Sequence, residues 1–176
     1  LKKADAATAM KLVSDPGLQQ KMQEWTNRRL ATSATPLQVR VERERARFSA
    51  WYEFFPRGAE GLSDKHSTFR DCLPRLQYAK ELGFDVIYFP PIHPIGIAHR
   101  KGKNNTLVAG PDDPGSPWAI GGPAGGHHEV GPQLGTLEDF ESLVREANQV
   151  GLEIALDFAI NCSPDLPYVK EHPDWF

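Results

Sequence analysis

A cationic stretch, RKGKNN, lies within the polar segment PPIHPIGIAHRKGKNNTLVAG at residues 90–110. Such a stretch could bind an anion, because lysine supplies a point charge and a glycine leaves backbone N–H groups accessible to phosphate oxygens. Charge runs more often face water without binding anything. Lys101, Lys103 and Asn104 are therefore either part of a phosphate-binding site or part of a solvated basic loop.

Two polar residues accompany the apolar run LEIALDFAI, Asp157 inside it and Asn161 directly after it. A carboxylate in such a run costs free energy unless a partner compensates it. Asp157 is therefore a structural residue bonded to backbone or arginine, a residue that orients an active site, or both. The amide of Asn161 offers two donors and an acceptor, which suit sugar hydroxyls. The alternative for Asn161 is a turn before the Ser-Pro pair.

Other residue types point less clearly to chemistry. Trp118, in SPWAIGG, could form an apolar wall for a sugar ring, or could simply pack within its loop. The histidines are dispersed, and the adjacent pair His127 and His128 cannot easily chelate one metal ion from a single face, so we expect no metal site. No serine lies in a GxSxG nucleophile elbow, so a Ser-His-Asp triad has no support.

Composition excludes several classes of protein. The 176 residues carry a net charge of −3, which argues against binding nucleic acid or a membrane surface through overall charge. No apolar run approaches the roughly 20 residues that span a membrane. Cys72 and Cys162 have no paired spacing, which predicts reduced thiols in a cytoplasmic protein.

Three apolar runs predict buried strands, and two amphipathic stretches predict the helices between them. The expected strands span residues 48–55, 84–89 and 152–160. The expected helices span residues 68–82 and 136–150. Each helical stretch begins with Thr followed three residues later by Asp, a signal typical of a capping box, and each ends at a glycine, Gly83 or Gly151.

The first 46 residues have a different pattern. The pair Asp15-Pro16 is a favourable helix start, and apolar residues at helical spacing predict helices within residues 1–30. The alternation in LQVRVER, residues 37–43, predicts a half-exposed strand. We therefore expect a mostly helical amino-terminal region at 1–46 and an α/β region at 47–176.

The order strand, helix, strand, long loop, helix, strand predicts a parallel α/β sheet with right-handed crossovers. No GxGxxG motif or P-loop follows any strand, so nucleotide-binding versions of this order have no support. The other arrangement is the first three strand-helix units of a (β/α)8 TIM barrel, whose chemistry lies at the carboxyl ends of its strands. In a barrel, residues 90–110 reach the same mouth as Asn161, which favours a binding role for the cationic stretch.

From Arg47 onward the sequence resembles the α-1,4-glucan:maltose-1-phosphate maltosyltransferases, a bacterial branch of the α-amylase superfamily. The resemblance covers about three quarters of the chain, in order. The segments FPPIHPIG, RKGKNNTL and WAIGGPAGGH are characteristic of this branch, whereas GTLEDF and LDF occur across α-amylase relatives.

The resemblance implies a barrel enzyme that moves maltosyl units from maltose 1-phosphate to the non-reducing end of an α-1,4-glucan. It implies retention through two carboxylates and a covalent glycosyl-enzyme intermediate. Lys101 matches the donor-binding lysine of the family, and Asn161 stands where the family usually has a glutamine that binds the donor sugar. Asp157 matches the first conserved aspartate of the superfamily. Cys162 replaces a histidine of hydrolytic amylases, which favours transfer over hydrolysis.

The resemblance further implies no cofactor, a homodimer for the full-length protein, and a nucleophile and acid/base that both follow Phe176. We therefore expect this chain to be a fragment without activity by itself. Trp118, Lys103 and Asn104 join Asp157 as candidate active-site support. Two alternative functions stay open: an α-amylase-type hydrolase or branching enzyme, and a non-catalytic carbohydrate-binding module.

Overall fold

The computed structural model describes residues 5–61 and 65–176. These residues form two compact units, Leu1–Val41 and Glu42–Phe176. The division falls slightly before the expected boundary after residue 46. The assignment of the first stretch to an accessory region stays a prediction.

The first unit contains two short helices, α1 (Ala6–Val13) and α2 (Pro16–Glu24). Asp15 caps α2 as its sequence predicts, because its Oδ1 accepts a hydrogen bond of 2.8 Å from the Leu18 N–H. Neither helix buries a residue within this unit. The helical expectation is confirmed for these segments, and its first four residues lie outside the described part of the chain.

The strand predicted at residues 37–43 is wrong. The structure has no strand there, and Leu37, Val39 and Val41 are all exposed. An alternating pattern becomes a strand only when a neighbouring strand accepts its backbone hydrogen bonds, and the described residues provide no such neighbour. A short helix, α3 (Glu44–Arg47), follows this extended segment.

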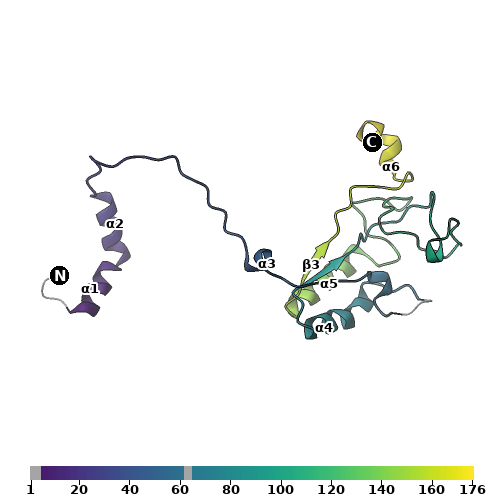
Figure 1. Ribbon diagram of the computed structural model, residues 1–176, viewed down its shortest axis with the longest axis horizontal. Helices are drawn as coiled ribbons and strands as arrows, with labels where there is room; N and C mark the ends of the chain where they lie inside the picture. The colour runs from purple at the N-terminus through teal and green to yellow at the C-terminus, as the bar shows by residue number, and fades with distance from the viewer. Residues whose placement is uncertain (1–4, 62–64) are drawn as a thin grey trace. The chain divides into compact units, whose positions relative to one another are not determined.

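The second unit is built on a parallel three-stranded sheet in the order β1-β2-β3 (Figure 1). The strands are β1 (Trp51–Glu53), β2 (Val86–Phe89) and β3 (Glu153–Leu156). In the register, Tyr52 pairs with Ile87, which pairs with Ile154. The predicted parallel α/β order is therefore confirmed.

Only the middle strand is buried as expected. Residues of β2 are buried except for Tyr88, whereas β1 alternates between exposed and half-buried positions. β3 is half-buried at best, and Phe158 and Ile160, which follow it, are each 81% exposed. The reason is position in the sheet, because among the described residues only β2 has a strand on both sides.

The two crossover helices are α4 (Leu73–Glu81) and α5 (Leu137–Gln149), which lie beside each other on one side of the sheet (Figure 1). The capping box predicted for α5 is present, since the Asp139 N–H donates to the Thr136 hydroxyl at 3.1 Å and the Thr136 N–H donates back to the carboxylate. α4 starts later than expected, after a 3-10 turn at Arg70–Cys72.

Both helices end where their glycines predict. Gly83 and Gly151 adopt φ of 88° and 78°, the left-handed conformation that ends a helix at low cost for glycine. The apolar side of α4 is only partly buried, since Leu76 and Ala79 face the core whereas Leu73 and Leu82 are exposed.

One hydrophobic core lies between the sheet and these helices. Its fully buried members come from both crossover helices, from β2 and from the segments that lead into α4 and β3. The largest are Phe69, Leu76, Ile87, Phe89, Leu143 and Leu152. The core therefore anchors the ends of the strands from which the polar loops leave. No helix of the described residues is long and apolar enough to cross a membrane.

Candidate functional site

The loops that follow the three strands gather beyond the carboxyl ends of the sheet (Figure 1). There the loops that follow β1 and β2 enclose an open groove, which we call the cationic groove because basic side chains outnumber acidic ones along it. Its principal side chains are Phe55, Arg57, Lys65, His66, Lys101, Lys103, Asn104, Asp112, Asp113 and Trp118. The loop that follows β2 therefore lies at the carboxyl ends of the strands, as predicted.

The three predicted residues of the RKGKNN stretch line this groove. Lys101, Lys103 and Asn104 are exposed. Among the described residues, no ion pair joins either ammonium to a carboxylate. Asn104 and Asn105 adopt positive φ of 54° and 63°, which asparagine tolerates better than most residues. The left-handed turn leaves both ammonium groups accessible from the groove.

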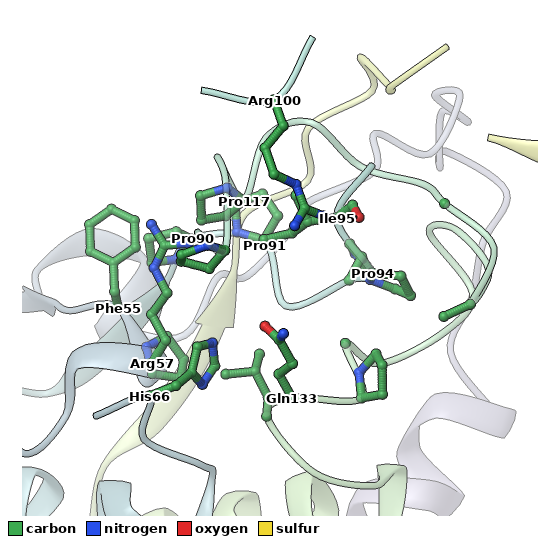
Figure 2. Close-up of a pocket in the computed structure, with 18 of the residues that line it drawn as sticks. Phe55, Arg57, His66, Pro90, Pro91, Pro94, Ile95, Arg100, Pro117 and Gln133 are labelled. Carbon is green, nitrogen blue, oxygen red and sulfur yellow. Dashed lines mark hydrogen bonds between the residues drawn. The ribbon is translucent and has the colours of Figure 1, made fainter. Parts of the chain in front are cut away.

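Arg100 has a different task from the lysines beside it. Its guanidinium donates to three backbone carbonyls, at 3.1 Å to Ile95, 3.0 Å to Gly96 and 3.0 Å to Asp113. Figure 2 shows the side chain reaching back toward Ile95. Arg100 therefore organises the loop, whereas Lys101 and Lys103 are available to a ligand.

The Asp157 carboxylate accepts hydrogen bonds from two aromatic side chains. The indole Nε1–H of Trp118 donates to Asp157 Oδ2 at 2.8 Å. A hydrogen bond between Tyr88 and this carboxylate is the main cause that raises the pKa of the Tyr88 phenol. The expected compensation is thus present, with an indole and a phenol in place of arginine or backbone. A role in orienting an active site stays a prediction.

Trp118 links the groove to the end of β3. Its ring packs edge-on against Phe55, with centroids 5.9 Å apart, and its carbonyl accepts a bond of 3.4 Å from the Asn161 amide. Asn161 itself is exposed. Trp118, Asp157 and Asn161, which the sequence proposes separately, therefore lie together beside the groove.

Arg57 and His66 are among the groove residues that were missed from the sequence. Arg57 donates to the Gly115 carbonyl at 2.7 Å, and its guanidinium carbon lies 5.6 Å from the centre of the Phe55 ring. Burial lowers the pKa of both the Arg57 guanidinium and the His66 imidazole. Arg57 shortly follows the first predicted strand, so its place at the strand ends could have been found from the pattern.

A second pocket lies next to the groove and shares Phe55, Arg57 and His66 with it (Figure 2). Proline rings form much of its wall, among them Pro90, Pro91, Pro94 and Pro117. Proline fixes its own φ and has no backbone N–H. The chain that leaves β2 is therefore stiff where it passes behind the groove.

His93 and His127 each lie within hydrogen-bonding distance of a backbone carbonyl oxygen. His93 Nδ1 lies 2.9 Å from the Glu129 carbonyl oxygen, and His127 Nε2 lies 2.7 Å from that of Ala159. No cluster of three His, Cys, Asp or Glu residues suited to a metal ion occurs among the described residues.

Comparison with known proteins identifies the family. Residues 56–174, more than half of the chain, match the family described as the alpha amylase catalytic domain. The chain belongs to the alpha-amylase family. Its three parallel strands and crossover helices are accordingly part of the (β/α) barrel of an alpha-amylase catalytic domain, as predicted.

A solved alpha-amylase supports this assignment. The chain is similar to the crystal structure of an alpha-amylase from Lactobacillus plantarum, with a TM-score of 0.55 and 36% sequence identity. The match covers 73% of this chain and 26% of the other.

Within the alpha-amylase family, the sequence is similar to maltosyltransferases. It is 59% identical over 149 residues to alpha-1,4-glucan:maltose-1-phosphate maltosyltransferase 1 of Streptomyces coelicolor, covering 85% of this chain and 22% of that protein. It is 51% identical over 168 residues to the corresponding enzyme of Methylacidiphilum infernorum, covering 95% of this chain and 25% of that protein. The chain thus spans about a quarter or less of the length of these relatives. The resemblance found in the sequence is confirmed.

Proposed function

We propose that this chain forms the donor-binding side of the active site in a maltosyltransferase. The full-length protein would move maltosyl units from maltose 1-phosphate to the non-reducing end of an α-1,4-glucan. One observation carries the proposal: two lysines without carboxylate partners among the described residues line a groove at the carboxyl ends of alpha-amylase-type strands. The similarity to maltosyltransferases supports the same donor.

The groove offers the contacts that a phosphorylated disaccharide needs. Its exposed ammonium groups would attract the phosphate of the donor and bind it through charge-assisted hydrogen bonds. Trp118 and Phe55 provide an apolar surface for a sugar ring. The exposed amide of Asn161 lies beside Trp118, where it could bind a hydroxyl group of the donor.

The reaction class follows from the barrel and its donor. Retaining enzymes hold a nucleophilic carboxylate and an acid/base carboxyl about 5–5.5 Å apart and pass through a covalent glycosyl-enzyme intermediate. In this proposal the residues of the chain bind and orient maltose 1-phosphate, and carboxylates of the full-length protein carry out the displacement. Phosphate would leave as the maltosyl–enzyme bond forms, and the glucan hydroxyl would replace the enzyme in the second step.

The reverse reaction tests this function. Full-length protein incubated with glycogen and inorganic phosphate should release maltose 1-phosphate, which 31P NMR distinguishes from inorganic phosphate. Incubation with maltose 1-phosphate and a short glucan should lengthen the glucan by two glucosyl units at a time. Release of free maltose or glucose without any dependence on phosphate would instead identify a hydrolase.

A homodimer of the full-length protein and a cytoplasmic location are further parts of the proposal. Cys72 and Cys162 are both free thiols, which is compatible with a reducing compartment. Analytical ultracentrifugation of the full-length protein tests the dimer, and fractionation of the source cells tests the location.

A further inference from the structure

The backbone immediately before Lys101 makes a tight turn. The Arg100 N–H donates to the Ile97 carbonyl at 3.1 Å, and His99 within the turn has a left-handed φ of 55°. This turn decides the direction in which the chain enters the cationic groove. The N–H groups of Ile97 and Ala98 point away from the turn and take a partner from another loop.

That partner is Asp165, in the segment after β3. A single carboxylate oxygen, Oδ2, accepts hydrogen bonds of 2.5 Å from both the Ile97 and Ala98 N–H groups. It lies 3.3 Å from the Ser163 hydroxyl as well. The two backbone donors are the main cause that holds the pKa of Asp165 below its usual value, so the group is a carboxylate at neutral pH.

Arg100 binds backbone carbonyl groups of the same loop. Its guanidinium donates to the carbonyl oxygens of Ile95 and Gly96, just before the turn, and of Asp113, farther along the same loop. Asp165 thus binds two backbone N–H groups of residues 95–98, and Arg100 binds two backbone carbonyls of the same segment. We call Asp165 and Arg100 together the clasp.

The segment that carries Asp165 packs tightly against the loop after β2. Ser163 is buried, and its N–H donates to the Ile120 carbonyl at 2.7 Å. A Cβ on Gly96 would lie 2.0 Å from the Ser163 hydroxyl oxygen and 2.7 Å from the Gly121 carbonyl oxygen. The loops after β2 and β3 therefore meet at a contact that only glycine permits at position 96.

We propose that Asp165 is a positioning residue of the donor site, which sets the location of Lys101 relative to Asn161. Asp165 belongs to the same loop as Asn161. Its carboxylate accepts hydrogen bonds from backbone N–H groups of the turn that precedes Lys101. Asp165 is not among the residues that line the groove. This role rests on the proposed donor function of the groove.

The kinetic test uses the full-length enzyme and two substrates. Asp165→Ala should raise the KM for maltose 1-phosphate about tenfold, because it removes a charged partner from two backbone donors. The KM for the glucan and the kcat should stay within about twofold of the wild type, an estimate that assumes the clasp acts only on donor binding. Asp165→Asn keeps an oxygen acceptor and should recover part of the donor affinity.

Asp139→Ala is the matched control. Asp139 is also a carboxylate that accepts bonds from a backbone N–H and a side chain, but it caps α5 and does not line the groove. This variant should lose stability without a change in the KM for maltose 1-phosphate. A donor KM that Asp165→Ala leaves unchanged, or that rises equally with the glucan KM, overturns the positioning role.

Hydrogen exchange separates the clasp from the proposed function. In the full-length protein, a peptide covering residues 95–103 should exchange about tenfold faster in Asp165→Ala than in wild type, while residues 137–149 stay unchanged. Unaltered exchange at 95–103 overturns the clasp even if the enzyme is a maltosyltransferase. If the wild-type protein makes no maltose 1-phosphate, the proposed function is refuted. The exchange experiment still tests the clasp in that case, because it does not depend on activity. If Asp165→Ala fails to fold, Asp165→Asn carries both measurements.

Discussion

Two neighbouring cations, Arg100 and Lys101, show how similar residues acquire different tasks. The planar guanidinium of Arg100 has several fixed donors and spreads them over three carbonyls of its own loop. Lys101 carries a compact charge on a flexible stem and stays exposed in the groove. Exchanging the two residue types would weaken the loop contacts made at position 100, because an ammonium lacks the fixed planar donors of a guanidinium, whereas position 101 would keep a positive charge.

Lys101→Ala in the full-length enzyme should raise the KM for maltose 1-phosphate by roughly 10- to 150-fold, since a hydrogen bond to a charged group contributes about 1.5–3 kcal/mol. The KM for the glucan should change little, because the acceptor carries no phosphate. Lys170→Ala, an exposed lysine of α6 (Pro167–Glu171), is the control for a lost surface charge. Initial rates with each substrate varied in turn give the two KM values. Equal effects on both would contradict a donor role.

Cys72 should resist thiol reagents in the native protein. Burial is the main cause that raises the pKa of its thiol to about 12, so the neutral form is favoured until the pH approaches that value. At pH 8 only about one molecule in ten thousand would carry the thiolate. Iodoacetamide at pH 8 followed by peptide mass spectrometry should leave Cys72 unmodified, with the half-buried Cys162 as the comparison thiol. Labelling of Cys72 should appear in urea, and rapid native labelling would contradict its burial.

At the scale of elements, the site depends on where loops meet rather than on the strands alone. β2 sends out a long loop that is stiffened by prolines, and the segment after β3 crosses it at Gly96 and Ser163. The bridge between Ile95 and Ile120 closes the same loop on itself. The groove is therefore held by contacts among loops that the core anchors at their strand ends.

Gly96→Ala should disturb this crossing. The added methyl would overlap the Ser163 side chain and a backbone carbonyl, and overpacking of this kind costs about 1–3 kcal/mol. We expect a lower thermal midpoint in calorimetry of the full-length protein and a higher KM for maltose 1-phosphate.

Gly58→Ala is the matched control for Gly96→Ala. A Cβ at Gly58 would meet no atom within 4 Å, and its φ is not in the left-handed region. This variant should leave the midpoint unchanged; because Gly58 lines the cationic groove, it is a control for stability and not for the donor KM. A Gly96→Ala protein that behaves in the same way would show that the two loops can separate without loss.

At the scale of the whole molecule, the second unit presents a sheet with two open edges among the described residues. β1 and β3 each pair on one side only, and large apolar side chains after β3 are exposed. An unpaired strand edge beside apolar surface favours association with other chains. Closure of the sheet into a barrel would satisfy both edges.

The 176-residue chain expressed alone should therefore show no transferase activity and should self-associate. The measurement is formation of maltose 1-phosphate from glycogen and phosphate, with size-exclusion chromatography on the same sample. The full-length protein is the control at equal molar concentration. Turnover by a monomeric 176-residue chain would contradict this expectation, and glucan binding by a folded chain without turnover would favour a carbohydrate-binding module.

Local signals in the sequence were sufficient for much of this structure. The capping pair Thr136 and Asp139, the helix-ending glycines Gly83 and Gly151, and the apolar run around β2 predicted their elements, because each acts through neighbours along the chain. The spacing of strands and helices also predicted that Lys101 and Asn161 lie at one end of the sheet. These features depend on short-range hydrogen bonding and on hydrophobic periodicity, which the amino-acid order alone determines.

Tertiary structure decided the rest. Residues 37–43 have a strand pattern but no neighbour to pair with, and the exposure of β3 depends on its place at a sheet edge. The clasp joins Asp165 to a backbone N–H 67 positions away, at Ala98, a contact for which the local sequence carries no signal. Only the folded chain shows that Arg100 is occupied with its own loop while Lys101 is accessible, because hydrogen-bond partners are set by distance in space and not by distance along the sequence.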